Sequence, residues 1–403
     1  MVSLTRAAGL AAMLPLAVGA AVLRVPQDHA TLQTAIDAAV TGDTVLVSPG
    51  TYRESLHIEG KDITLASEFF TTGDLGMIER TVLLGGSTDG KKGSGPILSI
   101  AKGVTFATKV VGFTFRQGDH GVLTRGQVQV LNNHFRENRD ALSCESGGAI
   151  VRGNRFEQNR DDGIDMDGAS YAVVEDNVIR DNRDDGLELR LHPYSTGEVL
   201  EIVIRGNTFI GNGGDGVQLI DYPGRTGRTI RIERNLFRQN AMSAIGATAD
   251  GRTRQDFQGS PLIEPVLILN NTVIDSPYGV VGGEAMLLLN NVFARISKVA
   301  LLHLGGDSVA GVNLIWQAGT ECEDCDLDQS QFVRSDPRLD ADDRPLPGSP
   351  CLEAGAATID FNGTTVSVSP ERSSGKAPEL GCKEDVSPST PSKAEPGTSG
   401  RDR

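Results

Sequence analysis

The residues with the clearest chemical potential are acidic, and they recur in the middle of the chain. An Asp-Gly pair followed by alternating apolar residues occurs three times, beginning at Asp162, Asp185 and Asp215. If the copies stack as neighbouring strands, carboxylates on adjacent copies lie ~5 Å apart and those two copies apart lie ~10 Å apart. These separations bracket those of retaining and inverting glycosidases, so the three Asp residues are candidate catalytic acids. The alternative is structural, because an Asp before Gly often caps its own turn.

A second acidic column follows from the alternation itself. The apolar residues of each copy face inward, so Asp165, Glu188 and Gln218 face outward on the same side of the stack. Stacked like charges repel one another, and Ca²⁺ relieves that repulsion because it binds several carboxylate oxygens at once. Asp165 and Glu188 are therefore the candidate ligands of Ca²⁺, which is the one cofactor we expect. The alternative is that neighbouring arginines neutralise these carboxylates, or that the column is simply solvated.

Cationic and aromatic residues stand at the end of the second copy and in the segments that follow. Arg190 and His192 are candidates for removing a proton next to a uronate carboxylate and for stabilising the charge that then forms. The candidate substrate-binding residues, whose rings can stack on a sugar and whose charges can bind it, are Asp167, Tyr194, Tyr222 and Arg225. The alternatives are an ion pair between Arg190 and Asp167, and loop packing for the others.

These residues belong to a longer repeat that must position them. An Asn recurs two residues before an apolar residue, at Asn133, Asn154, Asn177, Asn207, Asn235, Asn271 and Asn291. Counted from Phe113, the intervals are 20, 21, 23, 30, 28, 36 and 20 residues. Repeats of this kind stack on their neighbours to form one continuous core. An inward Asn at each bend can bond the Asn of the next coil and the backbone, so we expect asparagine ladders.

The longer intervals carry insertions, at residues 192–199, 221–228 and 249–261. Insertions in consecutive coils should project near one another and wall a groove over residues 140–228. Before the repeats, apolar residues recur at helical spacing between Leu32 and Ala39. A short helix at this place would cover the open end of the stack, whose strand edges would otherwise be unpaired.

Two segments resemble a known superfamily. Residues 25–67, VPQDHATLQTAIDAAVTGDTVLVSPGTYRESLHIEGKDITLAS, are similar to the opening of exported right-handed parallel β-helix proteins of the pectate-lyase-like superfamily. Residues 335–356, SDPRLDADDRPLPGSPCLEAGA, resemble the C-terminal segment of its bacterial members. The resemblance implies an all-β, right-handed parallel β-helix solenoid with a short N-terminal capping helix. It does not fix the chemistry, because the superfamily contains lyases, hydrolases, esterases, epimerases and non-catalytic proteins.

The acidic motifs also resemble, in part, those of polygalacturonase-type glycoside hydrolases. Asp162 matches the acid of the first motif of that family, and Asp184 with Asp185 matches the second. Asp215 stands where that family has His, and no Arg-Ile-Lys motif follows. The resemblance therefore keeps a hydrolase among the expected activities without selecting it.

The two ends of the chain differ from its body. Residues 1–20 have the parts of a signal peptide, with an apolar run and a small-residue cleavage site; the alternative is a membrane anchor. We expect the β-helix with its cap at 21–315, a C-terminal cap segment at 316–382 and a disordered tail at 383–403. No later stretch is apolar enough to span a membrane, so the protein is expected to be secreted, periplasmic or on the cell surface.

The cysteines and the net charge restrict the function further. Cys322, Cys325, Cys351 and Cys382 are candidate disulfide partners whose pairing the sequence leaves open, whereas Cys144 is expected to be a buried thiol. The formal net charge of -15 argues against nucleic acid as a partner.

The expected function is binding of an acidic polysaccharide, with cleavage or epimerisation by a uronate lyase, an epimerase or a polygalacturonase-like hydrolase. The main alternative is a non-catalytic glycan-binding or structural surface protein, which leaves open whether the chain is an enzyme. We expect a monomer; a third interpretation, a tail-spike-like adhesin, predicts an obligate trimer.

Overall fold

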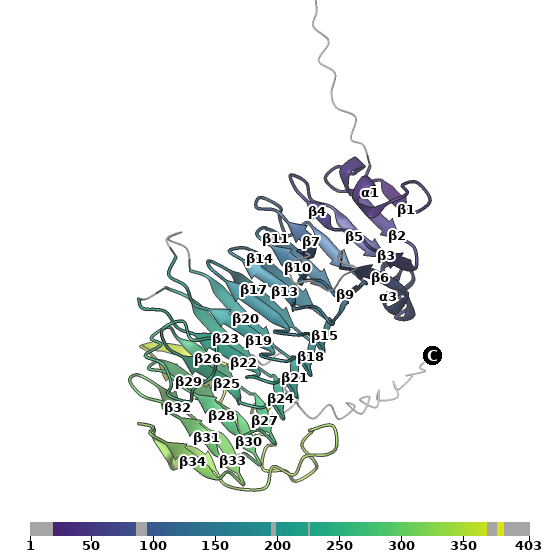
Figure 1. Cartoon of the computed structure of the whole chain (residues 1–403). Coiled ribbons are helices and arrows are strands. Elements are labelled where there is room, and N and C mark those ends of the chain that lie inside the picture. Colours follow the sequence, from purple (N-terminus) through teal and green to yellow (C-terminus); the bar gives the residue numbers. More distant parts are fainter. Residues whose placement is uncertain (1–18, 86–94, 195–198, 225, 369–376, 383–403) are drawn as a thin grey trace, which may run out of the picture.

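A computed structural model of the chain describes residues 19–85, 95–194, 199–224, 226–368 and 377–382. The described residues wind into a single parallel β-helix, in which each coil contributes one short strand to each of three sheets (Figure 1). The predicted signal peptide at 1–20 falls almost wholly, and the predicted disordered tail at 383–403 wholly, outside these residues. None of the three α-helices in the described part has the length or the hydropathy needed to cross a bilayer.

Three sheets, here called A, B and C, make up the wall of the β-helix. Within the described residues, sheet A contains twelve strands: β1 (Val22–Val25), β2 (Thr44–Val47), β5 (Thr64–Ser67), β8 (Lys109–Val111), β11 (Gln127–Leu131), β14 (Gly148–Arg152), β17 (Tyr171–Glu175), β20 (Glu201–Arg205), β23 (Thr229–Glu233), β26 (Val266–Leu269), β29 (Met286–Leu289) and β32 (Val309–Ala310).

Sheets B and C are built in the same way. In the described chain sheet B contains β3 (Gly50–Tyr52), β6 (Thr81–Leu84), β9 (Thr114–Arg116), β12 (His134–Arg136), β15 (Arg155–Glu157), β18 (Val178–Arg180), β21 (Thr208–Ile210), β24 (Leu236–Arg238), β27 (Thr272–Ile274), β30 (Val292–Ala294), β33 (Asn313–Trp316) and β35 (Phe332–Val333). Sheet C contains β4 (Leu56–Ile58), β7 (Pro96–Ile100), β10 (His120–Thr124), β13 (Asp140–Glu145), β16 (Ile164–Asp167), β19 (Leu187–Arg190), β22 (Val217–Ile220), β25 (Ser243–Thr248), β28 (Tyr278–Val281), β31 (Val299–Leu302) and β34 (Thr320–Glu323).

Inward-facing apolar columns form the core, in the register that the repeat predicts. Phe135 pairs with Phe156 on the next coil, and the column continues through Ile179 to Phe209 and Phe237. The Phe135 and Phe156 rings stack at 4.9 Å between centroids, and both are fully buried. Because neighbouring strands are ~4.8 Å apart, the ring spacing follows directly from the backbone register.

Two asparagine ladders hold the coils at their corners, as predicted. At the bend between sheets A and B, the Nδ2 of Asn177 donates to the Oδ1 of Asn207 at 2.9 Å and to the carbonyl of Val151 at 2.9 Å. The Oδ1 of Asn207 also accepts the backbone N–H of Asn177 at 3.0 Å. A second ladder, at the bend between sheets B and C, contains Asn138, Asn159, Asn182, Asn212 and Asn240. Each amide therefore pairs polar groups that the bend leaves without a strand partner.

The predicted capping helix is confirmed as α1 (Leu32–Ala38), whose apolar face is buried against the first coil. Its N-cap is Thr31, whose side chain accepts the N–H of Thr34. The carboxylate of Glu54 accepts the N–H groups of Leu32 and Gln33, so the first turn is anchored to the coil below. Two shorter helices, α2 (Phe69–Thr72) and α3 (Gly76–Arg80), follow β5.

The last part of the chain differs in detail from the expectation. The predicted boundary at residue 315 falls inside β33, and β34 and β35 continue the wall to Val333. After the short 3₁₀ helix η1 (Gln329–Gln331) and β35, the chain contacts the outside of earlier coils again, at Arg238 through Asp343 and at Asn270 through the carbonyl of Glu379. The hairpin of β36 (Thr358–Phe361) and β37 (Thr364–Ser367) packs on sheet A, where Phe361 lies in one apolar cluster with Leu267 and Leu287.

The predicted disulfides stay a prediction. Cys144, Cys322, Cys325 and Cys351 are free thiols, and Cys144 is buried, as expected. Cys322 and Cys325 lie close together, since a side-chain hydrogen bond with Cys325 raises the pKa of Cys322. The N–H of Leu380 donates to the carbonyl of Cys351 at 2.9 Å, which brings the chain just before Cys382 next to Cys351.

Candidate functional site

The candidate site lies on the outer face of sheet C, where three insertions follow consecutive strands. The predicted insertions at 192–199, 221–228 and 249–261 follow β19, β22 and β25 and precede β20, β23 and β26. The first two insertions touch each other, because the rings of His192 and Tyr222 stack with centroids 3.9 Å apart. The third touches the strands, since Gln255 donates to Asp215 at 3.1 Å. The insertions therefore gather beside the predicted acidic columns.

The outward acidic column has the predicted register but not the predicted exposure. Asp165 pairs with Glu188, and Glu188 with Gln218, on neighbouring strands. Only 9 % of Asp165, 3 % of Glu188 and 1 % of Gln218 is exposed, so the expectation of an exposed column was wrong. The side chain of Arg190 lies against Glu188 and Asp165. The column is the floor of the site rather than a solvated stripe.

Arg190 is the cation that neutralises this floor. Its Nε donates to Glu188 at 2.7 Å and lies 3.3 Å from an oxygen of Asp167 and 4.0 Å from one of Asp165. Burial raises the pKa of Glu188 to about 8 and that of Asp165 to about 6, against the opposing effect of Arg190. Burial would lower the pKa of Arg190, but the three surrounding carboxylates raise it, so its guanidinium stays charged.

The Asp-Gly positions form a third ladder, along the edge where sheet C begins. An oxygen of Asp162 accepts the backbone N–H of Asp185 at 2.9 Å, and one of Asp185 accepts the N–H of Asp215 at 2.5 Å. Asp215 in turn accepts the N–H of Ser243 at 2.7 Å. Asp162, Asp185 and Asp215 are 7 %, 1 % and 0 % exposed. Their carboxylates therefore join consecutive coils. They do not form a solvent-facing acid pair, and they do not cap their own turns, which was the alternative expectation.

The pKa values of these ladder carboxyls are raised. Burial raises the pKa of Asp162 and Asp185 well above the ordinary value, and in Asp185 the charge of Asp215 adds to the effect. Burial raises the pKa of Asp215 to about 6, and the hydrogen bonds from Ser243 and Gln255 limit this rise. One oxygen of Asp185 is buried without a hydrogen-bond partner among the described residues.

A carboxylate cluster that the sequence reasoning did not single out lies next to this ladder. Oxygens of Asp161, Asp162 and Asp184 all lie within 4.8 Å of one another, and they form the one group of potential metal ligands found in the described chain. The predicted ligands Asp165 and Glu188 are not part of it. The repeated Asp-Asp pairs at 161–162 and 184–185 were the sequence signal, because they place two acidic columns on adjacent rungs.

The donor set of this cluster fits a hard cation. Three carboxylates whose oxygens lie within 4.8 Å of one another repel one another, and Ca²⁺ prefers oxygen ligands of this kind. Burial and the charge of Asp161 raise the pKa of Asp184, whereas Arg254 from the third insertion lowers it. Asp162 is buried, Asp161 is half-buried and Asp184 is exposed, so the cluster opens to solvent on one side.

The remaining predicted residues lie in the first two insertions. The Nε2 of His192 is 3.7 Å from Asp167, and its side chain is 40 % exposed. The guanidinium of Arg228 lies 4.9 Å from the ring centre of Tyr194. Arg225 lies outside the described residues. Arg228, which the sequence reasoning missed, is 2 % exposed and donates to the carbonyl of His192 at 2.8 Å and to that of Gly168.

The acidic edge continues toward the N-terminus. Asp140 begins β13 in the rung before Asp162, and it is 2.8 Å from Arg139 and 3.3 Å from His120. Burial raises the pKa of Asp140 to about 7. The sequence places Asp119-His120-Gly121 and Arg139-Asp140-Ala141 at the position of the Asp-Gly motif, but only the exact repeats were recognised.

A cavity of about 1020 Å³ lies on the C-terminal side of the third insertion. Residues of that insertion form one wall, and His303, Cys322 and Cys325 belong to the other. The Nδ1 of His303 is 2.7 Å from Asp324.

Comparisons with known proteins agree with the architecture. A family model described as "Right handed beta helix region" matches residues 120–293. No curated protein matches the chain. The solved structure of pectate lyase Pel9A is 15 % identical, with 91 % of this chain and 97 % of that chain covered and a TM-score of 0.57.

Two other solved structures are more distant. The catalytic domain of a GH87 α-1,3-glucanase is 11 % identical, with 83 % of this chain and 70 % of that chain covered and a TM-score of 0.44. A PL6 family polysaccharide lyase from Pseudopedobacter saltans is 11 % identical, with 80 % and 94 % covered and a TM-score of 0.40. The family match and the similarity to the pectate lyase confirm the predicted fold. The chain is a right-handed parallel β-helix protein with a pectate-lyase-like fold.

Proposed function

We propose that the protein binds an acidic polysaccharide across the outer face of sheet C and cleaves it by β-elimination with the help of Ca²⁺. The observation that carries this proposal is the cluster of Asp161, Asp162 and Asp184 beside the floor of Asp165, Glu188 and Arg190. The similarity of the fold to a pectate lyase supports it. The apolar run at residues 1–20 favours export of the protein to the outside of the cytoplasm, where such polymers are found.

The electrostatics of the floor are compatible with an anionic substrate. Glu188, with a pKa of about 8, is protonated at neutral pH, so it does not repel a uronate. The charge of Arg190 offsets part of the negative charge of Asp167 and Asp165. Ca²⁺ held by Asp161, Asp162 and Asp184 would neutralise the uronate carboxylate and so make the proton at C5 more acidic.

His192 is the proposed base. Its side chain is partly exposed, and its Nε2 lies 3.7 Å from Asp167, which places the imidazole at the edge of the floor where a substrate can reach it. Removal of the C5 proton places the electron pair between C4 and C5, the C4–oxygen bond breaks, and water protonates the leaving oxygen. Arg190 is held in its charged form, so its role is to position the floor and not to accept the proton.

A non-catalytic glycan-binding protein is the second candidate. The observation that favours it is the ladder, because Asp185 and Asp215 are buried and their oxygens bond the backbone of the next coil. If these two carboxyls serve only the fold, the acid-base pair of a hydrolase is missing from this edge.

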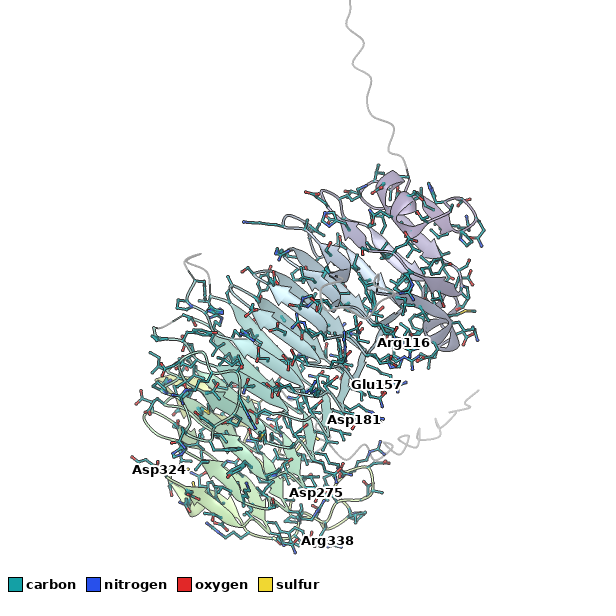
Figure 2. All side chains as sticks on the ribbon, viewed as in Figure 1. Arg116, Glu157, Asp181, Asp275, Asp324 and Arg338 are labelled. Carbon is teal, nitrogen blue, oxygen red and sulfur yellow. The ribbon has the colours of Figure 1, made fainter. Side chains whose placement is uncertain are left out.

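The deciding experiment measures Ca²⁺ binding by calorimetry and the ultraviolet absorbance of unsaturated products on a panel of uronate polymers. We expect Asp184→Asn to weaken Ca²⁺ binding by at least about tenfold and to abolish product formation. Asp181→Asn is the matched control, since Asp181 is exposed on the same coil and paired with Arg180, outside the cluster (Figure 2). Unchanged Ca²⁺ affinity in Asp184→Asn would refute the metal site. Binding of a polymer without unsaturated products or new reducing ends would favour the second candidate.

A further inference from the structure

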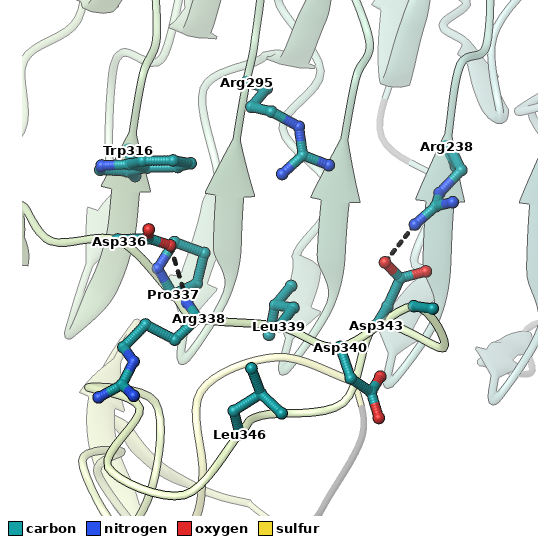
Figure 3. A pocket seen from close by; sticks show the side chains of 11 residues that line it. Arg238, Arg295, Trp316, Asp336, Pro337, Arg338, Leu339, Asp340, Asp343 and Leu346 are labelled. Carbon is teal, nitrogen blue, oxygen red and sulfur yellow. Dashed lines mark hydrogen bonds and ion pairs between the residues drawn. The ribbon is translucent and has the colours of Figure 1, made fainter.

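A second cavity lies on the other side of the molecule, between sheet B and the returning C-terminal segment. Its volume is about 670 Å³, which is within the range of pockets that hold small ligands. Figure 3 shows Trp316 at one end, the ion pair of Arg238 and Asp343 at the other, and Arg295 between them. Leu339 and Leu346 of the returning segment line the opposite side.

The strand register places the wall residues in one outward column. Arg238 pairs with Ile274, Ile274 with Ala294, and Ala294 with Trp316 on successive strands of sheet B. The neighbouring residues of each strand, including Phe237 and Phe293, face the core. The indole and the guanidinium are therefore held about 14 Å apart by three strand spacings, with the aliphatic Ile274 and Ala294 between them.

Three arginines and three aspartates line this cavity. Arg295 is bound by both oxygens of Asp275, at 2.6 and 3.1 Å, and Arg238 is bound by Asp343. Arg338 donates to the carbonyl of Gly348 at 2.9 Å, and Asp336 and Asp340 add further carboxylates to the lining. With two guanidiniums neutralised in this way, the cavity offers no excess positive charge to a phosphate or a uronate.

One donor in the cavity wall lacks a partner. The Nε–H of Arg238 is buried and has no hydrogen-bond partner within the described part of the protein. A buried donor of this kind costs free energy. The Arg238 side chain as a whole is 29 % exposed, so a sugar hydroxyl can accept a hydrogen bond from the accessible part of the guanidinium and at the same time donate to a carboxylate.

From this combination we propose that the cavity binds the neutral pyranose rings of an oligosaccharide. One ring stacks on Trp316, because the apolar face of a pyranose fits an aromatic platform, and its neighbours bond Arg238, Arg338 and the surrounding carboxylates. The cavity is on sheet B, so this secondary sugar site is independent of the chemistry proposed for sheet C.

The test uses the fact that Trp316 is the single tryptophan of the chain. The full-length protein is titrated with cellotriose, xylotriose and galactotriose, and with trigalacturonate as the anionic comparison, while tryptophan fluorescence is followed. We expect a saturable change with at least one neutral trisaccharide and a weaker response to trigalacturonate. No response to any neutral trisaccharide would overturn the proposal, as would a stronger response to trigalacturonate.

Variants then locate the bound sugar by calorimetry. Trp316→Ala and Arg338→Ala, the latter at an exposed residue, should each weaken binding at least tenfold, with Trp316→Phe retaining part of the affinity. Arg180→Ala is the matched control, because Arg180 occupies the same column of sheet B two coils away from Arg238. Full affinity in both Trp316→Ala and Arg338→Ala, with unchanged thermal unfolding, would place the sugar elsewhere and overturn the assignment.

Discussion

Arg190 donates a hydrogen bond of 2.7 Å to Glu188, two residues earlier on the same outward face of β19. The two side chains lie over the middle of sheet C, where Glu188 is 3 % exposed. Burial nevertheless exceeds the effect of this cation, so the pKa of Glu188 is raised from 4.5 to about 8. The floor of the candidate site is thus a place where a carboxyl group prefers to be neutral at physiological pH.

This relationship predicts how stability depends on pH. A carboxyl whose pKa is higher in the folded than in the unfolded state costs nothing below the unfolded value, and it destabilises the fold as pH rises through the folded value. For Glu188 this window runs from pH 4.5 to about 8. Glu188→Gln should therefore lose less stability than wild type across this window. Above pH 8 the two free energies of unfolding should differ by on the order of 1 kcal/mol or more in their change from low pH.

Chemical denaturation of both proteins at a series of pH values checks this prediction. The Gln amide keeps an acceptor for Arg190, so a lost hydrogen bond does not obscure the comparison. Asp181→Asn, at an exposed position, is the control and should leave the pH dependence of wild type unchanged. Parallel curves for wild type and Glu188→Gln would show that Glu188 is charged in the folded protein at neutral pH.

The wall of the β-helix could be predicted because the spacing of the sequence repeat determines the register of its strands. The spacing of Asn177, Asn207 and Asn235 indexes the coils, and the alternation around each Asn assigns the inward face. Both follow from local backbone geometry, so the predicted ladders and core columns agree with the structure. The C-terminal segment could not be placed in the same way, because its contacts with sheets A and B do not repeat.

The candidate site was predictable in register but not in environment. The sequence places Asp165 beside Glu188, but it does not reveal that Arg190 and the neighbouring rungs bury both. The cluster of Asp161, Asp162 and Asp184 was not predicted, because the Asp-Gly repeat marks the second Asp of each pair and not the first. Burial depends on side chains from several coils and insertions, and no single repeat contains that information.

The asparagine ladder should be a large contributor to stability, and Asn207 tests this. Its amide accepts the N–H of Asn177 at 3.0 Å and the Nδ2 of Asn177 at 2.9 Å, and it donates to Asn235 at 3.0 Å. Asn207→Ala leaves these buried groups without partners, at a cost of about 3 kcal/mol or more in the free energy of unfolding. Urea denaturation measures this cost. Glu201→Ala, at an exposed position on the preceding strand, should change it by less than about 0.5 kcal/mol, and equal effects of the two changes would contradict the prediction.

Arg228 should hold the insertion that carries His192. Its guanidinium is almost fully buried, and it donates to the carbonyl of His192 at 2.8 Å and to that of Gly168, over the ring of Tyr194. Arg228→Met keeps the length and apolar contact of the side chain but removes both hydrogen bonds, so the segment of residues 191–194 around His192 should open more often.

Limited proteolysis measures this opening, because cleavage of a closed segment requires local unfolding. We expect cleavage at residues 191–194 to be at least about tenfold faster in Arg228→Met than in wild type, since each lost bond to a charged group contributes roughly 1.5–3 kcal/mol. Arg231→Met is the matched control, because Arg231 lies on the adjacent strand β23 and is paired with Glu233. Accelerated cleavage throughout the chain would indicate global destabilisation, and an unchanged rate at this segment would show that Arg228 does not hold His192 in place.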